Sequence, residues 1–450
     1  MAFRILSLDG GGAWSLIQVL TLIDLYRSGG ALITGHDVLR DFDLVVANSS
    51  GSVVLGALVK DLPVVDIEPW FAALMTNEAM FPPLPRWSAP LRALKRAVGG
   101  LAPRYSAVAK LAALRRRLNG GEGEGGIGDL TIDAIKTRLR LPTQLVVTAF
   151  DHDQRREVLF RSNPASAAAS FGTPAVATLA EAIHASTTAP GGFFDRPAAV
   201  SRSRRCWDGS VAGLGNPLLD GLAEALANGI PPGEIQILSL GTGSVALPRA
   251  RGNEDPATRR LVAERRPAGW RRNLRRLADS ILDDPPDTAS LTAHLVLGGG
   301  VPGGRGTSIG SGRLVRMNPL VQPIRTADGW LRPAGLSEDG PMGDEFVRLS
   351  RLPIDAGAGR DLALIRKFCA LWHGDAVVNQ PIRANSDTLD CEIGQRWYSD
   401  AKGRWQALAG SGGTADAALM ANTPAAPPAG PTAPAPRPMP GGRLAASKLA

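Results

Sequence analysis

Three short segments of the sequence combine a polar side chain with small residues, and each directly follows an apolar run. They are Asp9-Gly10-Gly11-Gly12, Ala47-Asn48-Ser49-Ser50-Gly51 and Trp207-Asp208-Gly209-Ser210. An open α/β sheet binds its ligands at the carboxyl ends of its strands, so chemistry is expected at turns of this kind. Together the three turns offer a serine hydroxyl, a carboxylate and a row of glycine amides, which are the parts that acyl transfer requires.

The glycine turn, Asp9 to Gly12, follows an apolar strand and opens a helix. Backbone amides that converge at a helix N-terminus bind anions. A nucleotide phosphate is one conceivable ligand, but the third glycine of a dinucleotide fingerprint is replaced by Ser15, and no Walker motif is present. We predict that the turn forms an oxyanion hole with Gly10, Gly11 and Gly12. A tight turn with a purely structural role is the alternative.

The serine turn lies between an apolar strand and a helix, as a nucleophile elbow does. Counting back from Gly51 places the nucleophile at Ser49, whereas choosing Ser50 would put Ser52 where the elbow needs a small glycine. Ala47 replaces the usual first glycine. We therefore predict Ser49 as the nucleophile; a small-residue turn of purely structural role remains the alternative.

A serine nucleophile needs a base, and Asp208 stands at the end of a short predicted strand. The chain has five histidines, none of which lies in a local catalytic signature (His36, His152, His184, His294 and His373). His294 or His373 could still complete a Ser-Asp-His order like that of α/β-hydrolases. We predict Asp208 as the base and keep the histidine triad as an alternative.

These turns are carried by a series of apolar strands that alternate with helices. Continuous apolar strands in such an order predict an α/β fold around a mostly parallel sheet. The predicted strands are Phe3–Leu8, Phe42–Ala47, Gln144–Asp151, Glu157–Arg161, Arg205–Trp207 and Ile235–Leu240. The predicted helices are Ser15–Arg27, one beginning near Gly51, Thr178–Thr188 and Asn216–Ala227.

The sequence as a whole predicts three regions. Residues 1–250 form the acyl hydrolase domain, interrupted at 86–128 by a basic amphipathic insertion and a flexible glycine-rich loop. Residues 251–408 form a mixed α/β extension of unknown role, with a second basic stretch at 258–282 and a glycine-rich loop at 298–312. Residues 409–450 form an Ala/Pro-rich tail that is predicted to be disordered.

Composition and charge limit the partners and the cellular location that we expect for this chain of 450 residues. The net charge of +8 favours anionic partners, and the basic insertion predicts peripheral contact with an anionic membrane. Its cationic residues include Arg104, Lys110 and Arg115–Arg117; a solvated helix face is the alternative. Nucleic acid is not expected, because aromatic residues make up only 5% of the chain. Three scattered cysteines and the lack of a signal or membrane-spanning segment predict a cytoplasmic location, and no zinc-ligand spacing occurs.

Taken in order, the motifs resemble those of the patatin-like phospholipase family. The matching segments are Leu6–Gly12, Phe42–Ser52, Thr148–Ser162, Ala182–Phe194, Trp207–Pro217 and Ile237–Ser244. The resemblance implies a three-layer patatin-like fold and a Ser49-Asp208 dyad without histidine. It also implies an oxyanion hole at Gly10–Gly12 and cleavage of fatty-acyl esters of phospholipids or other lipids without metal or other cofactor.

One departure from the family pattern concerns the glycine loop. The family's arginine after the glycines is replaced here by Ala13-Trp14, which puts electrostatic support of that loop in question. A catalytically inactive homologue that binds lipid or protein is the alternative function. A second alternative function is that of an enzyme whose activity is regulated through the C-terminal region.

Overall fold

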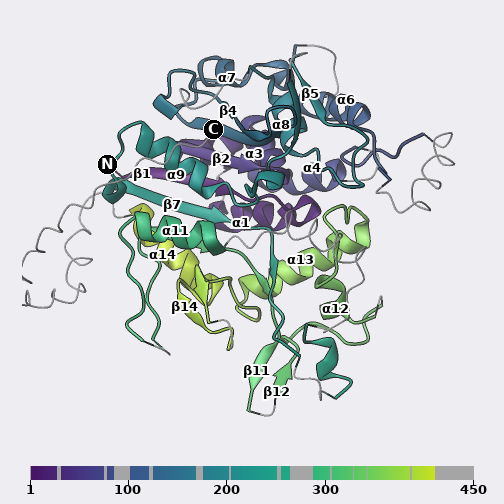
Figure 1. Ribbon diagram of the computed structural model, residues 1–450, viewed down its shortest axis with the longest axis vertical. Coiled ribbons are helices and arrows are strands. Elements are labelled where there is room, and N and C mark those ends of the chain that lie inside the picture. Colours follow the sequence, from purple (N-terminus) through teal and green to yellow (C-terminus); the bar gives the residue numbers. More distant parts are fainter. Residues whose placement is uncertain are drawn as a thin grey trace, which may run out of the picture. The chain divides into compact units, whose positions relative to one another are not determined.

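A sheet of eight strands runs through the part of the chain that the structure describes (Figure 1). This structure is a computed structural model that describes residues 2–27, 32–75, 79–85, 102–120, 125–168, 176–201, 204–250, 255–263, 287–304, 307–327, 329–341, 343–385 and 388–410. The strands are β1 (Phe3–Leu8), β2 (Leu44–Asn48), β3 (Gln144–Asp151), β4 (Arg156–Arg161), β5 (Ala198–Val200), β6 (Arg204–Asp208), β7 (Ile235–Leu240) and β9 (Leu314–Met317).

The strands follow the order β5-β6-β3-β2-β1-β7-β9, and β4 pairs with β3. The five strands from β3 to β9 in this order are parallel, whereas β4, β5 and β6 are antiparallel additions. The predicted α/β fold with a mostly parallel sheet is therefore confirmed. The parallel order brings the ends of β1 and β2 side by side, and β3 pairs with both β2 and β6.

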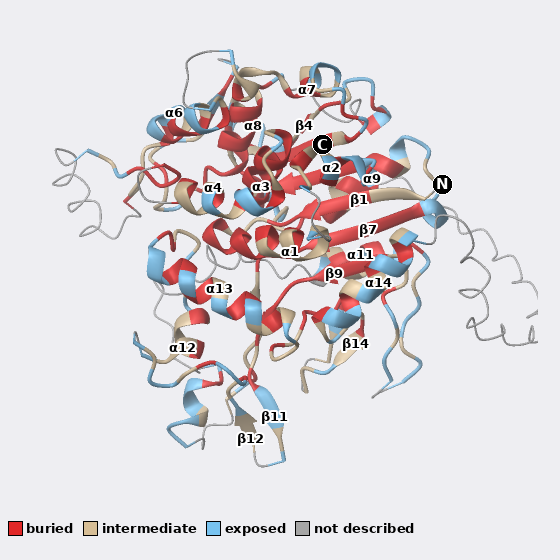
Figure 2. Ribbon diagram, turned by 180° about the vertical axis from the view of Figure 1, so that it is seen from behind, coloured by how far each residue is buried: buried red, intermediate tan, exposed pale blue. Residues whose placement is uncertain are grey.

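Helices cover both faces of this sheet, so the architecture has three layers (Figures 1 and 2). The strand residues alternate between two buried clusters: in β2, Val45 and Ala47 face one layer while Leu44 and Val46 face the other. The first layer contains α1 (Leu16–Tyr26), α3 (Ser50–Val59), α4 (Ile67–Leu74), α6 (Ala107–Leu118) and α8 (Leu179–Ser186), and the second contains α9 (Leu218–Ala227) and α11 (Asp287–Val296). Burial on both faces explains why the strands are continuously apolar.

Shorter elements surround these layers. The remaining described helices are α2 (Gly35–Arg40), α7 (Ile132–Arg138), α12 (Glu345–Leu349), α13 (Gly359–His373) and α14 (Tyr398–Gly410). Three two-stranded sheets pair β8 (Ser244–Val245) with β10 (Leu320–Val321), β11 (Ile324–Thr326) with β12 (Gly329–Leu331), and β13 (Arg383–Ala384) with β14 (Cys391–Ile393).

Residues beyond 250 contribute to the same core as the N-terminal half. Strand β9 extends the central sheet beside β7, and Met1–Ala409 form one compact unit. The ring of Trp405 in α14 stacks on Phe42, with centroids 5.8 Å apart, and Phe368 in α13 meets Trp14 edge to face. The distinct role expected for residues 251–408 stays a prediction, and residues 411–450 of the predicted tail lie outside the described residues.

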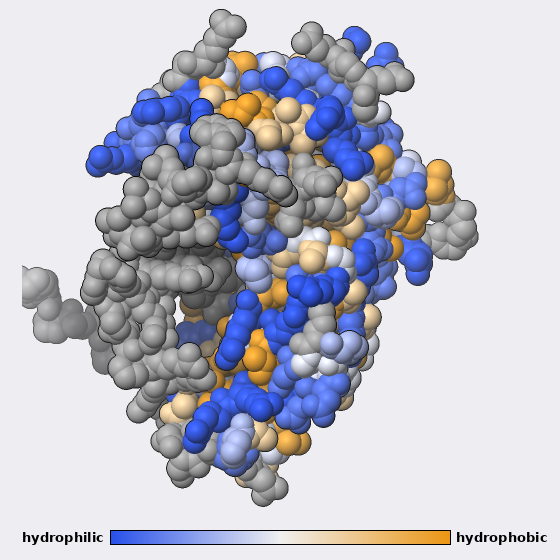
Figure 3. Space-filling model, turned by 90° about the vertical axis from the view of Figure 1, so that its right-hand side faces the viewer, coloured by the Kyte–Doolittle hydropathy of each residue, from blue (hydrophilic) through white to orange (hydrophobic). Residues whose placement is uncertain are grey.

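Two of the predicted basic segments are described only in part. Residues 86–101 and 121–124 of the insertion lie outside the described residues, as do residues 264–282 of the second basic stretch. On the face seen in Figure 3, hydrophilic residues are spread between smaller hydrophobic groups. Among the described helices, none combines the length and apolar character needed to cross a membrane. Peripheral membrane contact stays a prediction.

The Phe42–Trp405 stack tests whether the C-terminal helix stabilises the N-terminal half. We expect Trp405→Ala to lower the free energy of unfolding by about 3–5 kcal/mol, because it removes a large buried ring from the core. Urea denaturation measures this change. Leu331→Ala, at a side chain that is exposed, is the matched control and should change stability by less than about 0.5 kcal/mol. Equal stability of the two variants would contradict a shared core.

Candidate active site

Ser49 occupies a sharp turn between β2 and α3. Its backbone has φ 46° and ψ −126°, a strained conformation for a residue other than glycine. The Ser49 amide donates to Ser186 Oγ at 2.7 Å, which helps to hold the turn. A Cβ at Gly51 would lie 2.4 Å from the carbonyl oxygen of Leu8, so this position requires glycine. The turn thus has the geometry of a nucleophile elbow.

Asp208 ends strand β6 and faces Ser49. The Ser49 hydroxyl donates to Asp208 Oδ2 at 2.6 Å, although the two residues are 159 positions apart in the chain. The other carboxylate oxygen accepts the amide of Ser210 at 2.9 Å. Ser49 is 9% exposed and Asp208 is 4% exposed, so the contact is nearly shielded from water. The structure therefore brings together the two residues that the sequence predicted as nucleophile and base.

A chain of polar side chains fixes the spacing of the strands that carry this pair. Asn48 Oδ1 accepts a hydrogen bond from Thr148 Oγ1 at 2.7 Å, and Asn48 Nδ2 donates to Ser210 Oγ at 2.9 Å. These bonds link the ends of β2, β3 and β6. This bridging role of Asn48 was not predicted from the sequence. Its position directly before the nucleophile was the available signal.

The surroundings of Asp208 favour a carboxyl group that holds its proton more tightly than usual. Burial raises the pKa of Asp208 above its ordinary value, and the bonds from Ser49 and Ser210 and the charge of Lys110 oppose this shift. A carboxylate with a raised pKa is a stronger base. Burial thus makes the Asp208 carboxylate a stronger base than an exposed carboxylate would be.

The glycine loop lies beside the pair, but its amides are not all free. The Gly10 amide donates to the Gly215 carbonyl at 2.9 Å, and the Gly11 amide donates to Ser50 Oγ at 3.0 Å. For the Gly12 amide there is no acceptor in the described part of the chain. Of the three glycines predicted for the oxyanion hole, Gly12 is the one whose N–H is available in this conformation.

Residues from the C-terminal half close over this loop. Gly12 has φ +62°, and a Cβ there would lie 2.0 Å from the carbonyl oxygen of Ile354. The same carbonyl accepts the amide of Ala13 at 2.8 Å, and the Trp14 indole donates to the carbonyl of Leu352 at 3.3 Å. The residues that replace the family's arginine are therefore bound to the segment around Ile354.

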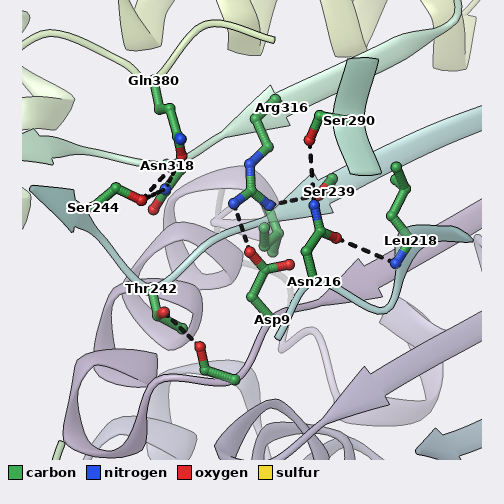
Figure 4. Close-up of polar contacts among 12 residues, drawn as sticks. Asp9, Asn216, Leu218, Ser239, Thr242, Ser244, Ser290, Arg316, Asn318 and Gln380 are labelled. Atoms are coloured by element: carbon green, nitrogen blue, oxygen red, sulfur yellow. Dashed lines mark hydrogen bonds and ion pairs between the residues drawn. The ribbon is translucent and has the colours of Figure 1, made fainter. Parts of the chain in front are cut away.

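An arginine from another part of the chain supports the first residue of the loop (Figure 4). Arg316, on β9, donates to Asp9 Oδ2 at 2.5 Å and to Ser239 Oγ at 2.7 Å, and both charged side chains are buried. Burial raises the pKa of Asp9, and the guanidinium of Arg316 opposes that shift. Thr242 Oγ1 also donates to the Gly10 carbonyl at 2.9 Å. No local pattern indicates Arg316 as a partner of Asp9, because the two residues lie 307 positions apart in the chain.

The histidine alternative is not formed in this structure. No hydrogen bond joins Ser49 or Asp208 to any of the five histidines, all of which belong to the described residues. The ring nitrogens of His294 contact the carbonyls of Ser311 and Gly300 at 3.2 and 2.8 Å. His373 packs against Tyr398, and burial lowers its pKa to about 4. Neither histidine completes a triad here. The described residues also contain no cluster of potential metal ligands.

Comparison with known proteins relates this site to a family. Residues 6–221 match the model of the family described as patatin-like phospholipase. This segment contains Ser49, Asp208 and the glycine loop. Over residues 6–221 the chain is therefore similar to the patatin-like phospholipase family.

Two solved structures match this chain with low sequence identity and low TM-scores. The crystal structure of VipD from Legionella pneumophila is 12% identical with a TM-score of 0.29, and the match covers 82% of this chain and 67% of VipD. The type III effector protein ExoU is 14% identical with a TM-score of 0.23, and the match covers 66% of this chain and 53% of ExoU. This chain thus spans about half the length of ExoU. A search of curated proteins found no match.

The Asp9–Arg316 pair gives a test of how the C-terminal half supports the glycine loop. We expect Arg316→Met to lower the free energy of unfolding by about 3–5 kcal/mol, because Asp9 then remains buried without its partner. Arg316→Met combined with Asp9→Asn should recover most of this loss in urea denaturation. The exposed Arg325→Met is the control and should stay within about 0.5 kcal/mol of the unmodified chain. Single and double variants of equal stability would contradict the pairing.

Proposed function

We propose that the chain is a serine lipid acyl hydrolase of phospholipase A type, with Ser49 as nucleophile and Asp208 as base. The observation that carries this proposal is the 2.6 Å hydrogen bond from the Ser49 hydroxyl to the Asp208 carboxylate at a strained strand–helix turn. A structural serine needs neither the strained backbone nor a buried carboxylate as acceptor. The match of residues 6–221 to the patatin-like phospholipase family supports a lipid as the substrate.

In the first half of the proposed reaction, Asp208 takes the hydroxyl proton as Ser49 Oγ attacks the carbonyl carbon of the fatty-acyl ester. The bond between this carbon and the alcohol oxygen then breaks, and Asp208 returns the proton to the leaving alcohol or lysolipid. In the second half, Asp208 takes a proton from water, and the resulting hydroxide attacks the acyl-serine. The fatty acid leaves, and the proton returns to Ser49 Oγ, so the enzyme is regenerated.

The negative charge that develops on the carbonyl oxygen needs donors that are already in place. We assign this role to the glycine loop, with the Gly12 amide as the first donor because it has no acceptor among the residues that the structure describes. The amide of Gly11 can join it if Ser50 Oγ turns away, since that hydroxyl also bonds with Ser15 Oγ at 2.6 Å. The Gly10 amide, which was predicted as a third donor, must first give up the Gly215 carbonyl.

We also propose that the enzyme reaches its substrate from the membrane surface as a peripheral protein. Arg116 and Arg117 support this part, because both are exposed at the end of α6, whereas Arg115 pairs with Glu181. Exposed arginines next to one another attract anionic head groups. The three free cysteines support a cytoplasmic location.

Hydrolysis by site variants tests the proposed function. We expect the unmodified chain to release fatty acid from phospholipid vesicles, faster from anionic than from neutral ones, as measured by mass spectrometry of the lipid products. Ser49→Ala and Asp208→Asn should each lower the rate by about 10³-fold or more, because neither half-reaction can then start.

Thermal unfolding of both variants is the control for folding. Release of fatty acid by Ser49→Ala at the unmodified rate would rule out Ser49 as nucleophile. A folded chain that releases no fatty acid, with or without the substitution, would favour the inactive lipid- or protein-binding homologue.

A further inference from the structure

A fully buried lysine lies close to the proposed active site. Lys110, on α6, has 0% exposure, and its ammonium nitrogen is 4.0 Å from the centre of the Phe194 ring. The sequence placed Lys110 among the cations that would meet a membrane. That assignment is wrong for this residue, because its side chain points into the core instead of toward solvent. A buried charge is costly unless several partners compensate for it.

The partners of Lys110 are three oxygen atoms at the end of α8. Its Nζ atom donates to Thr188 Oγ1 at 2.8 Å, to Thr187 Oγ1 at 3.0 Å and to the carbonyl of His184 at 3.3 Å. Both threonine hydroxyls already donate their own hydrogen to backbone carbonyls of α8. Each of the three oxygens can therefore only accept a hydrogen bond from Lys110 Nζ. Three such bonds need three hydrogens on Nζ, whereas a neutral amine carries two. This arrangement fits an ammonium group and does not fit a neutral amine.

The segment that Lys110 binds is also the segment that holds both members of the Ser49-Asp208 pair. Ser186 Oγ accepts the amide of Ser49 at 2.7 Å, and the carbonyl of Thr188 accepts the amide of Asp208 at 2.8 Å. Residues 186–188 thus connect the nucleophile's backbone to the base's backbone. A shift of this segment would change the distance between the two reacting side chains.

We propose that Lys110 is a positioning residue for the reaction: it anchors residues 186–188, which in turn hold the backbone amides of Ser49 and Asp208. This inference rests on the proposed function, because it assigns Lys110 a task only if Ser49 and Asp208 react. Of the segments of this sequence that resemble the family's motifs, Ala182–Phe194 includes the residues that Lys110 binds, and none includes Lys110 itself.

The charges of the two groups support this assignment. Burial lowers the pKa of Lys110 well below its usual value, and the Asp208 carboxylate acts in the opposite direction. Burial raises the pKa of Asp208, and Lys110 is the charged group that opposes this shift. Each residue therefore favours the ionised form of the other. Removal of the cation should leave Asp208 protonated up to a higher pH.

The test measures kcat, KM and the pH profile of kcat/KM for ester hydrolysis by four forms of the full chain: unmodified, Lys110→Met, Lys110→Arg and Lys60→Met. Lys60 is the matched control, since its Nζ also donates to a backbone carbonyl, that of Leu118, at 2.9 Å. It lies at the opposite end of α3 from Ser49, about 17 Å away along a helix that rises about 1.5 Å per residue. Titration with a serine-reactive phosphonate counts the competent sites, so kcat is expressed per site.

For Lys110→Met we expect kcat per site to fall by about 10²-fold with little change in KM, because the reacting groups are misplaced. The acid limb of kcat/KM should move to higher pH by about one unit, because Asp208 loses the nearby cation. Lys110→Arg should keep the acid limb near that of the unmodified chain, since it keeps the charge. Lys60→Met should change neither quantity.

Unchanged kcat per site and an unchanged acid limb in Lys110→Met would overturn the inference while leaving the proposed function intact. If Lys110→Met does not fold, Thr188→Val provides the test, because it removes one of the three oxygen atoms that accept from Lys110. Thr188→Val should also lower kcat per site. An unchanged kcat per site in this variant would overturn the inference. If the unmodified chain neither hydrolyses esters nor reacts with the phosphonate, both the function and the inference fail.

Discussion

The hydrogen bond between Ser49 Oγ and Asp208 Oδ2 is the contact on which the whole site depends. It joins two turns that are 159 positions apart, and it exists only because β3 pairs with both β2 and β6. Asn48 bridges the ends of these three strands through Thr148 and Ser210. The apolar strands stabilise the sheet, and the sheet sets the distance at which a buried carboxylate can take a proton from a strained serine.

The C-terminal half completes this site, although the family match ends at residue 221. Strand β9 adds Arg316, which reaches the first residue of the glycine loop, and the Ile354 carbonyl binds the amide of Ala13. The arginine that the family pattern has after the glycines is absent. A guanidinium nevertheless lies in this part of the site, supplied from a distant strand and directed at Asp9. The loop and the C-terminal half are therefore parts of one compact unit.

The strands and the positions of Ser49 and Asp208 at strand ends could be predicted because their signals are local. A continuous apolar run followed by small residues identifies a buried strand and the turn at its end, and that reasoning led to Ser49, to Asp208 and to a mostly parallel sheet. The partners of the glycine amides could not be predicted, since Gly215, Ser50 and Ile354 are neighbours only after folding. Lys110 shows the same limit: a basic stretch suggests an exposed face, but the burial of one of its side chains depends on how α6 packs against α8.

The most direct measurement of the central claim is mass spectrometric mapping of the site at which a fluorophosphonate modifies the protein. The contact with Asp208 should make Ser49 the reactive serine, so a single adduct is expected on the peptide that carries Ser49, and Asp208→Asn should slow its formation sharply. An adduct on a different serine, or modification of Ser49 at the same rate after Asp208→Asn, would contradict the account.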